Sequence, residues 1–168
     1  MNVGSDFHGV GHHLQVKAQA VSANQRDAYA RSAYNRYYYG AFLNVRRFLS
    51  EIDTSWSGLP HKSYPEILRG KVTRKFKDQR RRAYKVGDGK LVGRIDGVLR
   101  GLYEMADILE VAYGIRVVAD YYDNERVEFS ANDRFKLRSV SINDAHGWAE
   151  KTGILCQSAM NVWSTVDV

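Results

Sequence analysis

The sequence predicts an all-α fold, an up-and-down bundle of four or five helices that forms a single domain over residues 1–168. Three observations lead to this prediction. Pro60 and Pro65 lie close together and leave long proline-free stretches on either side, where helices can continue without interruption. Apolar residues recur at helical spacing in those stretches. The length suits one domain, and no linker rich in proline, glycine or serine divides the chain.

Two helices are expected in the first third of the chain. Residues 12–22 have helical composition, and the glycines before them indicate a flexible N-terminus. Asn24 is expected to cap a second helix that continues to about Leu49. Its tyrosine-rich stretch, residues 35–42, spreads aromatic rings around the helix, so we expect these rings to lie mainly in the core. Residues 53–65 are rich in turn formers and predict a loop.

Two further helices are expected after the loop. The most regular pattern starts at Leu91, where apolar residues recur at alternating spacings of four and three. A final helix is expected from about Ala145 to Val166, with Asn143 or Asp144 as its cap. Between them, residues 126–140 partly alternate apolar and polar side chains, which predicts a short extended segment, although a loop is equally compatible. The inward side chains of the final helix are expected to be Trp148, Ile154, Leu155, Met160 and Trp163.

Glycines at positions 93, 97 and 101 fall on one strip of the helix that starts at Leu91. They either allow another helix to pack closely there or simply weaken the helix by about 1 kcal/mol each relative to alanine. The sequence leaves both readings open.

Positive charge is concentrated in one segment of a chain whose formal net charge is +6. Residues 69–85 contain a single acid, Asp78, among these basic residues: Arg69, Lys71, Arg74, Lys75, Lys77, Arg80, Arg81, Arg82 and Lys85. Such a segment repels itself and attracts polyanions, whether it is a helix or a mobile loop. The residues expected to bind RNA are Lys75, Lys77, Arg80, Arg81 and Arg82.

Composition points to a cytoplasmic protein without membrane contact. No apolar run approaches the roughly 20 residues that a membrane-spanning helix requires, and no signal-peptide pattern opens the chain. Cys156 is the single cysteine, so no internal disulfide can form. No metal or cofactor is expected, because His8, His12 and His13 have no cysteine or carboxylate beside them to complete a site.

Two segments resemble elements of HEPN-domain proteins. Residues 35–42, NRYYYGAF, resemble the Ser-Arg-Ala-Tyr-Tyr-Ala-Ala-Phe stretch common in bacterial and archaeal members. The agreeing residues are Arg36, Tyr38, Tyr39, Ala41 and Phe42. Residues 114–123, GIRVVADYYD, resemble the Arg-x-x-Ala-Asp-Tyr element that ends the third main helix in many such proteins. The two elements occur in the order that the family has.

This resemblance implies a helical bundle that is often a homodimer and is often encoded beside a minimal nucleotidyltransferase or within a phage-defence system. It implies RNA or a nucleotide as the ligand and a nucleotidyltransferase as a partner. Many members are metal-independent endoribonucleases. Two functions follow as expectations: an RNA-directed endoribonuclease of a toxin–antitoxin or phage-defence system, or a non-catalytic HEPN module that binds a nucleotide, RNA or a partner protein. A nucleic-acid-binding helical domain outside the family is a third reading.

Arg116 is the residue that stands out on the helix after Leu91, because it falls where the apolar stripe next requires an apolar side chain. Asp120, four residues later, can pair with it. In one interpretation Arg116 is a cation near a helix C-terminus that Asp120 braces. In the other it faces a cleft and stabilises the charge that develops on a scissile phosphate. Both interpretations stay open.

The HEPN nucleases, as the resemblance implies, place a histidine about one turn after the arginine to handle protons. Here Tyr121 stands five positions after Arg116, and a phenol with an ordinary pKa near 10 is a poor base at neutral pH. The expected catalytic residues are therefore Arg116, Asp120 and Tyr121, and the usual chemistry of the family is in question. His61 and His146 are the histidines that could substitute.

Overall fold

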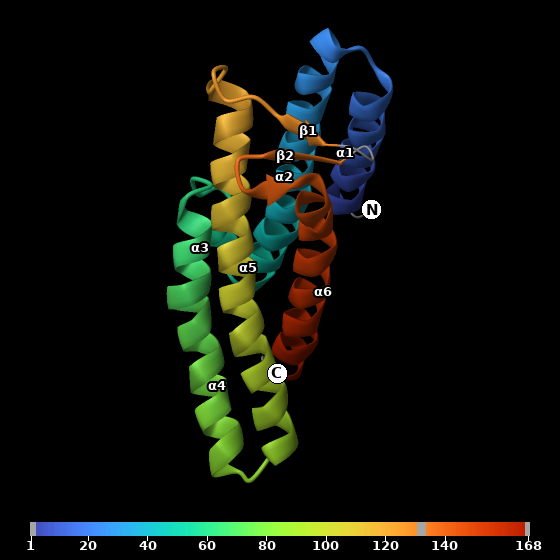
Figure 1. Ribbon diagram of the computed structural model, residues 1–168. Coiled ribbons are helices and arrows are strands. Elements are labelled where there is room, and N and C mark those ends of the chain that lie inside the picture. The colour runs from blue at the N-terminus through green and yellow to red at the C-terminus, as the bar shows by residue number, and fades with distance from the viewer. Residues whose placement is uncertain (1–2, 131–133, 167–168) are drawn as a thin grey trace. The chain divides into compact units, whose positions relative to one another are not determined.

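The computed structural model describes residues 3–130 and 134–166, and most of them are helical (Figure 1). The predicted helical class is confirmed. In chain order the elements are α1 (Val3–Ala20), α2 (Ala23–Ile52), the 3-10 turn η1 (Thr54–Trp56), α3 (Ser63–Ile67), the π-helical turn η2 (Leu68–Val72), α4 (Thr73–Lys85), α5 (Gly89–Tyr121), β1 (Glu128–Ser130), β2 (Arg134–Leu137), β3 (Val140–Ser141) and α6 (Ile142–Val166). Within these described ranges, no helix is long and apolar enough to cross a membrane.

The chain divides into two compact units, each built from two stretches of sequence. Unit 1 comprises the described parts of Met1–Asn44 and Val111–Lys151. Unit 2 comprises Val45–Glu110 and the described part of Thr152–Val168. The single domain expected from the sequence stays a prediction.

The core of unit 1 forms around the tyrosine-rich stretch of α2. Tyr34, Tyr37 and Tyr38 are fully buried there. Tyr39 is partly buried, and its ring contacts those of Phe7, Tyr38 and Phe42. Gly40 allows a close approach, because a Cβ atom at this position would lie 3.0 Å from the Cβ of Ala149 on α6.

The N-terminus differs from the prediction. Helix α1 begins at Val3 rather than near residue 12, so the expected flexible N-terminus is wrong. The reason is packing: a Cβ atom at Gly11 would lie 2.8 Å from ring atoms of Tyr37, which means that this glycine lets α1 lie directly against α2. Tertiary contacts of this kind override the low helix propensity of glycine.

The extended segment predicted near residues 126–140 is confirmed as a small antiparallel sheet with the strand order β1–β2–β3. Phe129 pairs with Phe135, and Leu137 pairs with Val140. The part of this prediction that falls on residues 131–133 lies outside the described residues.

The hydroxyl of Tyr34 attaches the sheet to α2. It accepts a hydrogen bond from the backbone N–H of Leu137 at 3.1 Å and donates one to the carbonyl of Val140 at 2.8 Å. Two strand groups that would otherwise be buried without partners are thereby paired.

The predicted helix caps are wrong by a few residues. The N–H of Asp144 donates to the hydroxyl of Ser141 at 3.1 Å, and that hydroxyl donates to the Asp144 carboxylate at 2.7 Å. Ser141 is therefore the N-cap of α6, and α6 begins three residues earlier than expected. Likewise, α2 begins at Ala23, so Asn24 lies inside the helix rather than capping it.

In unit 2, the basic segment is helical and forms η2 and α4. Phe76 of α4 is buried and packs edge-on against Trp163 of α6, with ring centres 5.5 Å apart. The expectation that Ile154 points inward is wrong, because the buried face of this half of α6 follows the spacing Thr152, Cys156, Ala159 and Trp163.

The glycine strip of α5 is covered only in part. A Cβ atom at Gly101 would lie 3.1 Å from the side chain of Leu155, whereas Cβ atoms at Gly93 and Gly97 would meet nothing within 4 Å among the residues placed in the structure. Close helix packing therefore explains Gly101 alone.

Candidate functional site

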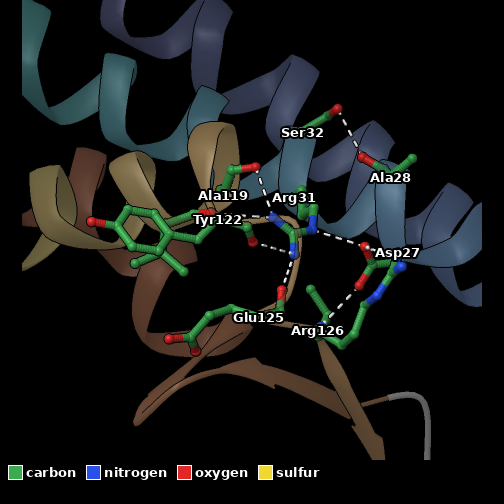
Figure 2. A network of polar contacts seen from close by, with 10 residues as sticks. Asp27, Ala28, Arg31, Ser32, Ala119, Tyr122, Glu125 and Arg126 are labelled. Atoms are coloured by element: carbon green, nitrogen blue, oxygen red, sulfur yellow. Dashed lines mark hydrogen bonds and ion pairs between the residues drawn. The ribbon is translucent and has the colours of Figure 1, made fainter.

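The last turn of α5 is held by an arginine of α2 (Figure 2). The guanidinium of Arg31 donates hydrogen bonds to the backbone carbonyls of Val118, Ala119, Tyr122 and Glu125. The final carbonyls of a helix have no partner within the helix, and a cation is favourable beside them. Arg31 supplies both the donors and the charge.

Asp27 holds Arg31 in position at the end of α5. Its carboxylate lies 2.8 Å from Nε of Arg31 and accepts a hydrogen bond from the N–H of Val127 at 2.9 Å. Burial raises the pKa of Asp27, but the hydrogen bonds from Val127 and Arg31 outweigh burial and hold this pKa below its ordinary value. The network joins α2, the end of α5 and the chain that enters β1, and so it positions the end of α5, where the predicted catalytic residues stand.

Arg116 and Asp120 form the predicted pair one turn apart on α5. Nε of Arg116 lies 2.8 Å from a carboxylate oxygen of Asp120, and the two side chains are 19% and 26% exposed. The amide of Asn35, on α2, donates to both carboxylate oxygens of Asp120, at 2.8 and 3.0 Å. The structure therefore brings together the two segments that resemble the HEPN family. The contribution of Asn35 was not predicted.

Aromatic rings border this pair. The guanidinium carbon of Arg116 lies 5.5 Å from the ring centre of Tyr121. Burial opposes the charge of Arg116, but Asp120 and the phenols of Tyr39 and Tyr121 outweigh burial and raise the pKa of Arg116 above its ordinary value. The guanidinium therefore stays charged at every physiological pH, and Asp120 neutralises it.

Two buried polar atoms of this cluster lack a hydrogen-bond partner among the residues that the structure describes: Oδ1 of Asn35 and Nε of Arg116. Nε lies within ion-pair distance of Asp120, but the alignment is not that of a hydrogen bond. Buried polar atoms in folded proteins nearly always have partners, so two exceptions in one cluster require an explanation. One of these atoms is an acceptor and the other is a donor, and both belong to residues that contact Asp120.

The structure places His146 with other histidines rather than with Arg116. Its ring centre lies 4.4 Å from that of His8 and 5.5 Å from that of His12, both on α1. Burial, followed by the charges of His8 and His12, lowers the pKa of His146, and Arg116 is not among the groups that act on it. His146 therefore does not take the place of the family's histidine. His61 belongs to unit 2, whereas Arg116 belongs to unit 1.

This histidine cluster had no signal in the sequence, because residues on α1 and α6 are brought together only by packing. Over residues 3–130 and 134–166, no group of three or more His, Cys, Asp or Glu side chains is placed so that it could hold a metal ion.

The basic helix α4 contains both paired and unpaired cations. Among the residues predicted to bind RNA, Arg80 pairs with Asp96 at 2.6 Å and Arg81 pairs with Asp78. Lys75 lies over the rings of Trp56 and Trp163 at about 6 Å. Lys77 and Arg82 are exposed, and neither makes an ion pair or hydrogen bond with any residue in the described part of the chain. Three of the five predicted residues are thus partly engaged within the protein.

One face of α4 presents a row of cations, which we call the α4 cation row: Arg74, Lys77, Arg81 and Lys85. At about 100° per residue these positions lie within one strip of the helix, opposite the buried Phe76 and Ala83. Beside the row lies a hollow of about 390 Å³ lined by Lys77, Arg80, Arg81 and Leu99. A strip of this kind can bind successive phosphates of a polyanion.

No protein-family model matches this chain, and no curated protein or solved structure is significantly similar to it. The HEPN resemblance therefore rests on the two segments that meet at Asn35 and Asp120. Membership of that family, a homodimer and a nucleotidyltransferase partner stay predictions.

Proposed function

We propose that this protein is an RNA-binding helical module of HEPN type that holds RNA without cutting it, and that α4 supplies the phosphate contacts. The observation that carries the proposal is the α4 cation row. Its cations repeat along a single exposed face, and Arg74, Lys77 and Lys85 have no ion pair with any residue in the described ranges. Cations that are not needed for folding are free to neutralise the phosphates of a ligand.

The arrangement around Arg116 supports a non-catalytic role. Asp120 neutralises Arg116, Asn35 holds Asp120, and the groups that act on the charge of Arg116 are a carboxylate and two phenols. A general base that works near neutral pH is not among them. The same cluster can therefore hold α2 and α5 together.

Salt dependence of RNA binding tests the proposal. Each phosphate contact releases counterions and contributes about 0.7 to 0.9 to the slope of log affinity against log salt concentration. The variant Arg74→Gln/Lys77→Gln/Lys85→Gln removes three exposed cations and should reduce this slope by about 2 for a fluorescein-labelled RNA.

The matched control is Arg126→Gln/Lys136→Gln/Arg138→Gln, which removes the same charge from residues that pair with acids in unit 1. The control should leave the slope near that of the parent protein. Equal slopes for the parent and the α4 variant would contradict the proposal.

A second candidate function is metal-independent RNA cleavage at Arg116, Asp120 and Tyr121. The specific observation in its favour is the pair of buried atoms without hydrogen-bond partners, Oδ1 of Asn35 and Nε of Arg116. A phosphate oxygen and a ribose hydroxyl are groups that could satisfy them.

A further inference from the structure

We propose that the turn between α4 and α5 binds unpaired bases of single-stranded RNA, with Tyr84 as the surface on which a base stacks. The proposal rests on the proposed function, because the cation row of α4 would hold the phosphates of the same strand. It adds a class of RNA and a residue that recognises the base.

The turn is held rigidly by its own backbone. Gly87 has the left-handed φ of 75°, its N–H donates to the carbonyl of Tyr84 at 3.1 Å, and the N–H of Asp88 donates to the carbonyl of Ala83 at 3.0 Å. These are the two bonds of a Schellman motif, the usual end of an α-helix at glycine. The carboxylate of Asp88 accepts from the N–H of Leu91 at 2.9 Å and so caps α5.

The apolar side chains of this ordered turn face solvent. Tyr84 is 74% exposed and Val86 is 80% exposed, which makes them the most exposed large apolar side chains in the described part of the chain. Folding does not require these exposed positions to be apolar. A tyrosine presented on a rigid turn offers a flat surface with little conformational entropy to lose on binding.

Tyr84 is aligned with the cations of α4. Lys77, Arg81 and Tyr84 are separated by four and three residues, so they lie along one side of the helix. Arg80, one turn before Tyr84, is close enough that the phenol acts on its charge. The hollow lined by Lys77, Arg80, Arg81 and Leu99 lies along the same helix as Tyr84.

Charge complementarity favours a nucleic-acid strand over other occupants. Exposed cations flank the turn on both helices, from Arg82 and Lys85 on α4 to Lys90 on α5, while the carboxylate of Asp88 is engaged as a cap. Figure 1 shows α4 and the beginning of α5 as adjacent antiparallel helices joined by this turn. A base can stack on a protein ring only when it is not stacked within a duplex, so the expected ligand is single-stranded.

The test compares Tyr84→Ser with Tyr84→Phe in the full chain. A short single-stranded RNA carrying 2-aminopurine and fluorescein reports both stacking, as loss of 2-aminopurine fluorescence, and affinity. Tyr84→Ser should weaken binding about tenfold and abolish the fluorescence loss, whereas Tyr84→Phe keeps the ring and should retain both. Tyr103→Ser, at a tyrosine of α5 that is 45% exposed, is the matched control and should have no effect.

The outcomes separate this proposal from the proposed function. If the triple variant of α4 weakens RNA binding while Tyr84→Ser does not, RNA binding stands and the stacking role is wrong. If the parent protein binds no RNA at all, both proposals fail. If Tyr84→Ser loses the same affinity for single-stranded and for duplex RNA, the stacking role is also overturned. A loss of affinity confined to vesicles of anionic phospholipid would overturn it too and would assign the turn to a membrane surface.

Discussion

At the scale of single residues, the pair of Arg116 and Asp120 separates the two candidate functions. Replacing Arg116 with alanine leaves the Asp120 carboxylate with the amide of Asn35 as a hydrogen-bond partner and without its cation. Under the proposed function, Arg116→Ala should lower the free energy of unfolding by about 1 to 3 kcal/mol, because a partly buried charge loses its partner. Urea denaturation measures this loss, and RNA affinity should stay unchanged.

The control for this prediction is Arg100→Ala, which removes an exposed cation from the same helix. Cleavage of labelled RNA in the presence of EDTA is measured in parallel. A parent protein that cuts RNA under these conditions, with Arg116→Ala cutting about a hundredfold more slowly while keeping its stability, would contradict the non-catalytic proposal and support the second candidate. Tyr121→Phe would then show whether the phenol transfers a proton.

At the scale of elements, the attachment of the sheet to α2 depends on one hydroxyl. Tyr34 is fully buried, and burial raises the pKa of its phenol, so the group stays neutral. Tyr34→Phe keeps the ring but leaves the Leu137 N–H and the Val140 carbonyl without their partner. We expect a loss of about 1 to 3 kcal/mol in the free energy of unfolding and faster amide exchange at Leu137.

Tyr103→Phe removes a hydroxyl from an exposed tyrosine and should leave the stability of the protein unchanged. Equal stabilities for Tyr34→Phe and the parent would show that the hydroxyl does not hold the sheet. Urea denaturation and hydrogen exchange followed by mass spectrometry make the comparison.

At the scale of the whole molecule, acid should destabilise the fold in two stages. The pKa of His146 is below its ordinary value of 6.5 in the folded protein, because of burial and the charges of His8 and His12, while Glu150 acts in the opposite direction. The unfolded chain therefore binds a proton at His146 more readily. The contribution of His146 to the free energy of unfolding is fully present above pH 6.5 and is lost as the pH falls through the depressed pKa of the folded state.

Protonation of carboxylates causes the second stage of this destabilisation by acid. The pKa of Asp27 is below its ordinary value of 3.8 in the folded protein, so its contribution is present above that value and is lost as the pH falls through the folded pKa. The free energy of unfolding, measured in urea from neutral pH to below about 4, should show both decreases. His146→Gln should remove the first decrease and retain the second, and a curve with an unchanged first decrease would assign it to other groups.

The features that depend on near neighbours in the chain can be read from the sequence alone. Periodicity along the chain predicts the helices, alternation near residues 126–140 predicts the strands, and the spacing of four residues brings Arg116 beside Asp120. The basic composition of residues 69–85 is likewise a property of the sequence alone. These features could be predicted because helix and strand geometry fixes which close neighbours share a face.

Contacts between distant segments are established by the tertiary structure alone. It places the amide of Asn35 against Asp120 and the guanidinium of Arg31 at the end of α5. It also places His8 beside His146 and pairs Arg80 with Asp96, whereas Lys77 has no ion pair among the described residues. It also made a helix of the glycine-containing N-terminus. The physical reason is that such contacts depend on which helix faces pack together, and packing across the chain outweighs the propensity of any single residue.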